Sequence, residues 1–162
     1  MQFDELENKG LIRRTKINFK HIYDFLSRSR QDLQTSISNL SIDEAWSYAI
    51  AYHAMLRAGR SLMMSFGFRP LGKDQHATVV RFASIVFGNE YKDLINKFDR
   101  KRRKRHDFIY GIGSGQKVIE ISKKEPVEPY FRNFLLSLVT NPSQFFSVPT
   151  AFFACLLYPC ST

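Results

Sequence analysis

The sequence predicts an all-α protein, an up-and-down bundle of four to five helices. Three observations lead to this prediction: apolar residues recur at helical spacing, strand patterns are weak throughout, and helix-capping or helix-stopping residues separate the periodic segments. The 162 residues, 44% of them hydrophobic, suit one domain with a single core. We expect a helical domain over residues 1–139 and an apolar, proline-containing tail of uncertain structure over residues 140–162.

The first long helix is predicted over about residues 18–39, with Asn18 as its N-cap. Its apolar residues lie mostly at helical spacing: Phe19, Ile22, Tyr23, Phe25, Leu26, Leu33 and Ile37. The second helix is predicted from Ser41 to about Phe66, because Ser41 and Glu44 have the spacing of a capping box. Its small residues permit close packing, and Trp46 and Tyr52 are expected in the core.

Glycine and proline residues separate the later helices. Gly67 is a candidate left-handed C-cap, and Pro70 stops the second helix. Asp74 is expected to cap a helix that ends near Phe87, before another helix over about residues 90–110. A glycine-rich connector over residues 111–115 then leads to a final helix over about residues 122–139.

Six consecutive basic residues, Arg100 to Arg105, are the most informative feature of the chain. They carry a charge of +6, in a chain whose formal net charge is +9. Adjacent cations repel one another, and a nucleic-acid phosphate is the obvious anion to neutralise them. In a helix, Arg102, His106 and Tyr110 are successive i, i+4 positions, with Arg103 nearly aligned. The spacing predicts one phosphate-facing surface.

Other functions are disfavoured by what the sequence does not contain. The first residues lack an apolar signal segment, no apolar run approaches the roughly 18 residues of a membrane span, and the two cysteines, Cys155 and Cys160, make no disulfide framework. We therefore expect a cytoplasmic protein that does not bind membranes. No metal-ligand cluster or carboxylate pair stands out, so we expect no metal site and no cofactor.

Three stretches together resemble the HEPN family (higher eukaryotes and prokaryotes nucleotide-binding domain), over about residues 15–115. The stretch from Ala51 to Arg60 looks like its "A-Y-x-A-M-x-x-A-x-R" helix, and residues 67–70 with His76 look like its "G-x-R-P … H" connection. The stretch from Arg102 to Tyr110 looks like its late helix. The resemblance implies a helical bundle, usually dimeric, that binds RNA or nucleotides. Many members are metal-independent endoribonuclease toxins paired with a nucleotidyltransferase antitoxin.

The family motif, an Arg followed after four to six residues by a His, fits this chain in two ways. By count, Arg100 pairs with His106; by surrounding pattern, Arg105 is the motif arginine and Tyr110 stands where the His usually is. The resemblance thus implies Arg105, His106 and Tyr110 as catalytic residues. The basic run supplies the phosphate-binding residues Arg100, Arg102 and Arg103. Because a phenol with a pKa near 10 is a poor base at neutral pH, a catalytically silent binding or adaptor module is the alternative.

The tail from residue 140 onward is aromatic, interrupted by prolines, and without clear periodicity. Three interpretations stay open: it covers the core, it mediates dimerisation, or it is the aberrant end of a truncated or frameshifted reading frame.

Overall fold

The computed structural model of the chain describes residues 3–110, with their side chains except at residues 90 and 105–110. The elements in order are α1 (Asp4–Asn8), β1 (Ile12–Arg14), α2 (Phe19–Asn39), α3 (Glu44–Ser65), β2 (Phe68–Pro70), α4 (Gln75–Phe87), a 3-10 turn η1 (Asn89–Tyr91) and α5 (Lys92–Tyr110). The described part is mostly helical, as predicted. The expected helix over residues 122–139, the connector over 111–115 and the tail lie outside the described residues.

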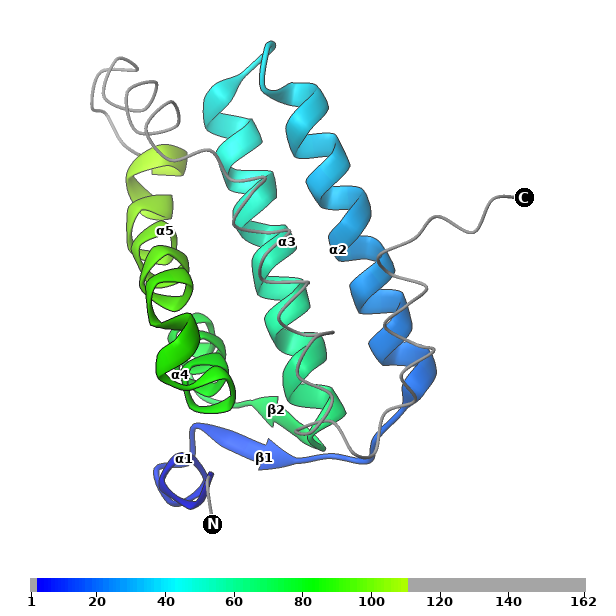
Figure 1. The fold of residues 1–162 in the computed structure, drawn as a ribbon, viewed down its shortest axis with the longest axis vertical. Helices are drawn as coiled ribbons and strands as arrows, with labels where there is room; N and C mark the ends of the chain where they lie inside the picture. The colour runs from blue at the N-terminus through cyan, green and yellow to red at the C-terminus, as the bar shows by residue number, and fades with distance from the viewer. Residues whose placement is uncertain (1–2, 111–162) are drawn as a thin grey trace.

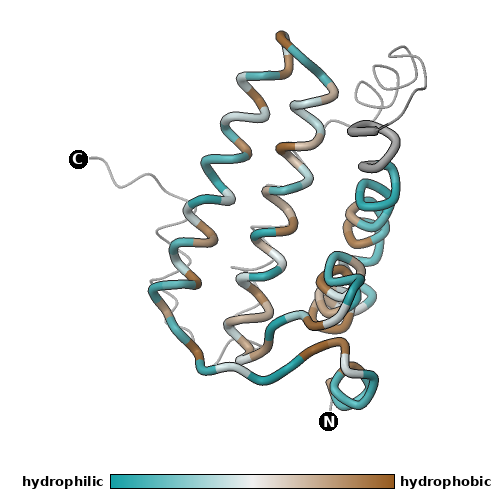
Figure 2. Tube along the Cα trace, turned by 180° about the vertical axis from the view of Figure 1, so that it is seen from behind, coloured by the Kyte–Doolittle hydropathy of each residue, from teal (hydrophilic) through white to brown (hydrophobic). Residues whose placement is uncertain are grey.

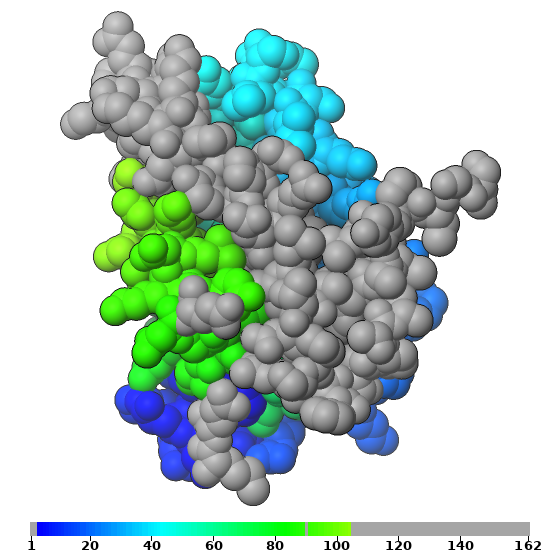
Figure 3. All heavy atoms as spheres, in the orientation of Figure 1, coloured from blue at the N-terminus to red at the C-terminus, as the bar shows by residue number. Residues whose placement is uncertain are grey.

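Helix α3 is the centre of the described fold. It lies along α2 on one side and contacts α4 and α5 on the other, and α1 and the two short strands lie together at one end (Figure 1). Hydrophobic positions alternate with hydrophilic ones along α2 and α3, as an amphipathic pattern requires (Figure 2). In the space-filling view, α5 lies at the surface above the α1 segment (Figure 3). Among the described helices, none has the length and apolar character that crossing a membrane requires.

Small residues let α3 occupy this central position. A Cβ on Gly59 would lie 2.4 Å from the Val79 Cγ1 atom of α4, so the absence of a side chain permits the close approach of the two helices. Tyr52 and Met55 of the same helix are fully buried. At the end of the bundle, the Phe3 ring stacks on Phe82 with centroids 4.4 Å apart.

Two of the predicted caps are confirmed and one is wrong. The Asn18 side chain accepts a hydrogen bond from the His21 amide at 3.1 Å, and Asp74 accepts one from the Ala77 amide at 3.4 Å. The predicted box at Ser41 is wrong, because α3 begins two residues later than a Ser41 cap would allow. Asp43 is its N-cap and accepts from the Trp46 amide at 2.9 Å.

The end of α3 was predicted correctly, but the ribbon beyond it was missed. Gly67 has a φ of +74°, which confirms the left-handed residue after the helix. The following strand β2 pairs antiparallel with β1, with Arg13 opposite Arg69. Strands of three residues are too short to show an alternating pattern in the sequence.

Fewer apolar residues of α2 are buried than the helical periodicity predicted. Phe19, Tyr23 and Ile37 are exposed, because α2 packs chiefly against one neighbour, α3, and therefore buries only a narrow stripe. That stripe is partly polar, and it includes Ser29 and Asp32. Trp46, expected in the core, is 59% exposed at the start of α3.

Candidate functional site

The side chains of the basic run on α5 lie in different surroundings. Lys101 is 1% exposed, and its ammonium lies 4.7 Å from the centre of the buried Tyr48 ring. Arg102 is half-buried, whereas Arg100 and Arg103 are exposed. Side chains of consecutive residues in the run therefore point in different directions, because each residue turns by about 100° around the helix. Of the predicted phosphate-facing surface, the structure describes the side chains of Arg102 and Arg103.

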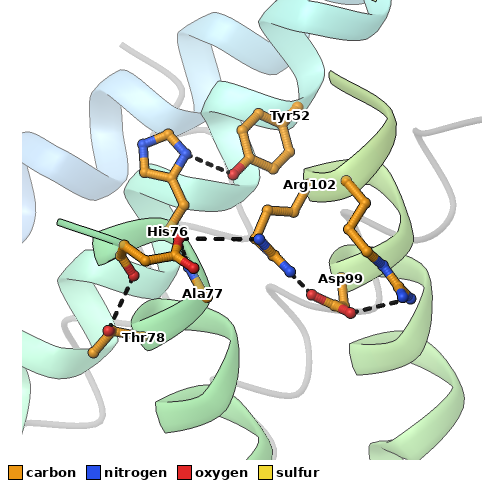
Figure 4. Close-up of polar contacts among 8 residues, drawn as sticks. Tyr52, His76, Ala77, Thr78, Asp99 and Arg102 are labelled. Atoms are coloured by element: carbon orange, nitrogen blue, oxygen red, sulfur yellow. Dashed lines mark hydrogen bonds and ion pairs between the residues drawn. The ribbon is translucent and has the colours of Figure 1, made fainter. Parts of the chain in front are cut away.

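Asp99, the residue directly before the run, forms ion pairs with two of its arginines. Arg102 Nε donates to the Asp99 carboxylate at 2.8 Å, and an Arg103 guanidinium nitrogen lies 3.1 Å from the other oxygen. These ion pairs reduce the repulsion within the run and fix the direction of Arg102. Figure 4 shows the Arg102 side chain extended from α5 toward the start of α4.

Arg102 thereby reaches a hollow that we call the polar pocket. Its volume is about 270 Å³, and it is lined by Arg60, Lys73, Asp74, Gln75, His76 and Arg102. The lining residues come from α3, from the turn before α4, from the first turn of α4 and from α5. Three lining cations face one carboxylate, so the pocket carries an excess of positive charge.

Hydrogen bonds to the core and to the helix end fix the walls of the polar pocket. The Tyr52 hydroxyl, on a side chain with no exposed surface, lies 2.9 Å from His76 Nδ1 (Figure 4). Asp74 caps α4, its backbone oxygen accepts from the Thr78 hydroxyl at 3.1 Å, and its carboxylate lies 4.0 Å from Arg102 Nη1. The pocket is therefore largely formed before any ligand enters.

Arg60 is a cation of the polar pocket with an unsatisfied buried donor. Its Nη2 donates a long hydrogen bond of 3.4 Å to Gln75 Oε1, and its buried Nε makes no hydrogen bond with any group that the structure describes. Buried donors are usually paired, so such a guanidinium favours an additional acceptor. An oxyanion supplies acceptors with the geometry that a guanidinium fork prefers.

The structure brings one of the predicted site residues into the polar pocket. Arg102 lines it, while Arg100 and Arg103 are not among its lining residues. The side chains of Arg105, His106 and Tyr110 lie outside the described part, although α5 itself continues through Tyr110. In the described part of the chain, no three His, Cys, Asp or Glu side chains come together as a metal site would require.

The sequence analysis did not select Arg60, Lys73, Gln75 or His76 as site residues. A signal was nevertheless present, since Arg60, His76 and Arg102 belong to the three separate stretches on which the family resemblance rests. Nothing in their spacing along the chain shows that they meet.

The comparisons with known proteins add no assignment: no family model matches the chain, and no match is found among the curated proteins or the solved structures. The resemblance to the HEPN family accordingly stays a prediction from the residues.

Proposed function

We propose that the protein binds RNA or a nucleotide through a phosphate group held in the polar pocket. The observation that carries the proposal is the convergence of Arg60, Lys73 and Arg102 on one hollow, where the described part of the chain supplies a single lining carboxylate. Guanidinium groups bind phosphate through paired, charge-assisted hydrogen bonds, and a lysine adds a point charge. The basic sequence pI of 9.7 favours the same kind of partner.

The more specific form of the proposal is metal-independent RNA cleavage. A histidine can accept the proton of the 2′-hydroxyl, whose oxygen then attacks the adjacent phosphorus while the 5′-oxygen leaves and takes up a proton. His76 lies in the polar pocket, and the family resemblance assigns Arg105, His106 and Tyr110 to this chemistry. Cationic side chains at the phosphate would stabilise the charge of the transition state.

One contact favours the second candidate, a catalytically silent binding module. His76 is hydrogen-bonded through Nδ1 to the buried Tyr52, which ties the ring to the core in the way a structural histidine is tied. On this alternative the pocket binds phosphate and leaves the strand intact.

Binding is tested by fluorescence polarisation with a short labelled single-stranded RNA. We expect Arg102→Gln and Lys73→Gln each to weaken binding about tenfold, because each removes a charge-assisted contact. Lys92→Gln is the matched control: it removes the same charge from α5, roughly 15 Å along the helix from Arg102. Equal losses in all three variants would mean that only net charge matters.

Cleavage is tested by incubating RNA with the protein in EDTA and examining the products. An endoribonuclease degrades RNA under these conditions, and Arg105→Ala, His106→Ala or His76→Ala abolishes the degradation. Intact RNA together with salt-dependent binding identifies the silent module.

The proposal includes a homodimer and a nucleotidyltransferase-type partner, both implied by the family resemblance. Light scattering of the purified chain tests for the homodimer. Co-purification with a protein encoded nearby tests for the nucleotidyltransferase-type partner. Antitoxins of this type can adenylylate a tyrosine, and Tyr110 is the matching position. If the Tyr110→Phe variant were neutralised as readily as the parent, adenylylation at that position would be excluded.

A further inference from the structure

A second hollow, which we call the ribbon hollow, adjoins the polar pocket. Its volume is about 410 Å³, and it is lined by Arg13, Phe25, Arg60, Met64, Arg69, Pro70, Leu71 and Gln75. Arg60 and Gln75 line both hollows, so they form the wall between the two. Its volume falls in the range of roughly 300–1,000 Å³ that is typical of small-molecule sites.

Apolar side chains from four places line one part of the ribbon hollow. Phe25 comes from α2, Met64 from α3 and Pro70 from β2, and Leu71 follows directly. All four remain partly or largely accessible, and Met64 also packs against the core. A flat apolar group of a ligand would remove this surface from water.

Arginines line the rest of the ribbon hollow, and among its lining residues that the structure describes none is acidic. Arg13 and Arg69 are direct partners across the two strands, and both are exposed. Like charges placed opposite each other destabilise a strand pair unless an anion lies between them. Arg14, the next residue on β1, differs: its guanidinium donates to the Glu7 carboxylate at 2.9 Å.

We propose that the two hollows together hold one unpaired nucleotide of an RNA strand, an inference that rests on the proposed function. The polar pocket takes one phosphate, the apolar side chains of the ribbon hollow take the base, and Arg13 and Arg69 take the next phosphate along the strand. Gln75 lies on the shared wall, where its amide can both donate to and accept from a base edge. A base in a duplex is paired and stacked, and cannot enter the ribbon hollow.

The proposal is tested by comparing four probes in polarisation and competition assays: a short single-stranded RNA, the same strand in a blunt duplex, an abasic strand of equal length, and ribose 5-phosphate. We expect the single strand to bind about 5- to 100-fold more tightly than the duplex or the abasic strand, the range that stacking of one base provides. The Arg13→Gln/Arg69→Gln variant binds the single strand more weakly than the parent does, because it has lost a phosphate contact, and Arg14→Gln keeps the parent's affinity. Thermal unfolding checks that both variants are folded.

The outcomes separate the two proposals. If ribose 5-phosphate binds and Arg102→Gln weakens it, the phosphate pocket stands; equal affinities for single strand and duplex then overturn the nucleotide site alone. The nucleotide site alone is also overturned if the Arg13→Gln/Arg69→Gln variant binds the single strand as the Arg14→Gln variant does. If no phosphate-bearing probe binds at all, both proposals fail.

Discussion

Lys101 and Arg102 are neighbours in one basic run, but they occupy opposite environments. Lys101 is buried against the Tyr48 ring, whereas Arg102 lines the polar pocket. The aliphatic stem of a buried lysine packs as a hydrophobic side chain, and a desolvated cation over an aromatic ring adds to its stability. Lys101 is therefore a structural residue, even though its charge alone suggests phosphate binding.

We predict opposite effects from substituting these two neighbours. Lys101→Ala should lower the free energy of unfolding by about 2–4 kcal/mol, because it leaves a cavity in the core, and should leave the RNA affinity of the folded protein unchanged. Arg102→Gln should weaken RNA binding and lower the free energy of unfolding by about 1 kcal/mol or less. Urea titration and polarisation measure the two quantities. A loss of RNA affinity in folded Lys101→Ala would contradict the assignment.

At the scale of single residues, the sequence correctly predicted the features that depend only on neighbours along the chain. Asn18, Gly67 and Asp74 have the cap positions expected of them, because caps bond to groups only a few residues away. The prediction of an N-cap at Ser41 was wrong because a second residue suited to capping, Asp43, follows two residues later. The sequence does not show which of the two has the extended backbone that an N-cap needs.

The contact between α3 and α4 depends on one residue that has no side chain. Gly59 is placed so that an added Cβ would meet Val79 Cγ1 at 2.4 Å, a distance at which either the Val79 side chain or one of the two helices must shift. Valine is stiff at χ1, so its methyl group cannot turn away without cost. The spacing of these two helices also fixes where the polar pocket forms, since Arg60 follows Gly59 and His76 opens α4.

We predict that Gly59→Ala destabilises the protein by about 1–2 kcal/mol. The substitution overpacks the contact between the helices, and this cost is partly offset by roughly 1 kcal/mol because alanine is more favourable in a helix than glycine. In a Val79→Ala background the clashing methyl group is absent, and the same substitution should become neutral or stabilising. A double-mutant cycle by urea denaturation measures this change of sign. Additive effects in the cycle would show that Gly59 and Val79 do not limit the helix spacing.

At the scale of elements, helical periodicity predicted the long helices, but not which of their faces are buried. Phe19, Tyr23 and Trp46 are apolar by type but exposed, since how much of a helix is covered depends on how many neighbours it has. The ribbon of β1 and β2 was missed for a related reason. Its pairing joins residues 12–14 to residues 68–70, a long-range contact for which three-residue strands give no local signal.

At the scale of the whole molecule, the candidate site is formed by residues from several different elements. Arg13, Arg60, Lys73 and Arg102 are far apart in sequence, and only the packing of β1, α3, α4 and α5 brings them to two adjoining hollows. The sequence predicted the type of ligand from its basic charge, and it predicted Arg102 as a phosphate contact. It could not show that the other cations of the site come from the ribbon, the second half of α3 and the turn before α4, because no pattern within a single element places them there.

The salt dependence of RNA binding distinguishes this local site from attraction by the overall net charge of +9. Each phosphate neutralised on a single strand contributes a slope of about −0.7 to a plot of log affinity against log salt concentration, so the two phosphates held by the cations of the two hollows predict about −1.4. Binding by the whole net charge would give a slope of about −6. We expect the Arg13→Gln/Arg69→Gln variant to reduce the magnitude of the slope by about 0.7, and Arg14→Gln to leave it unchanged. Polarisation titrations over a series of KCl concentrations measure the slope. A reduction in Arg14→Gln that is half as large as in the double variant, in proportion to the charges removed, would show that the ribbon arginines act only through their contribution to the net charge.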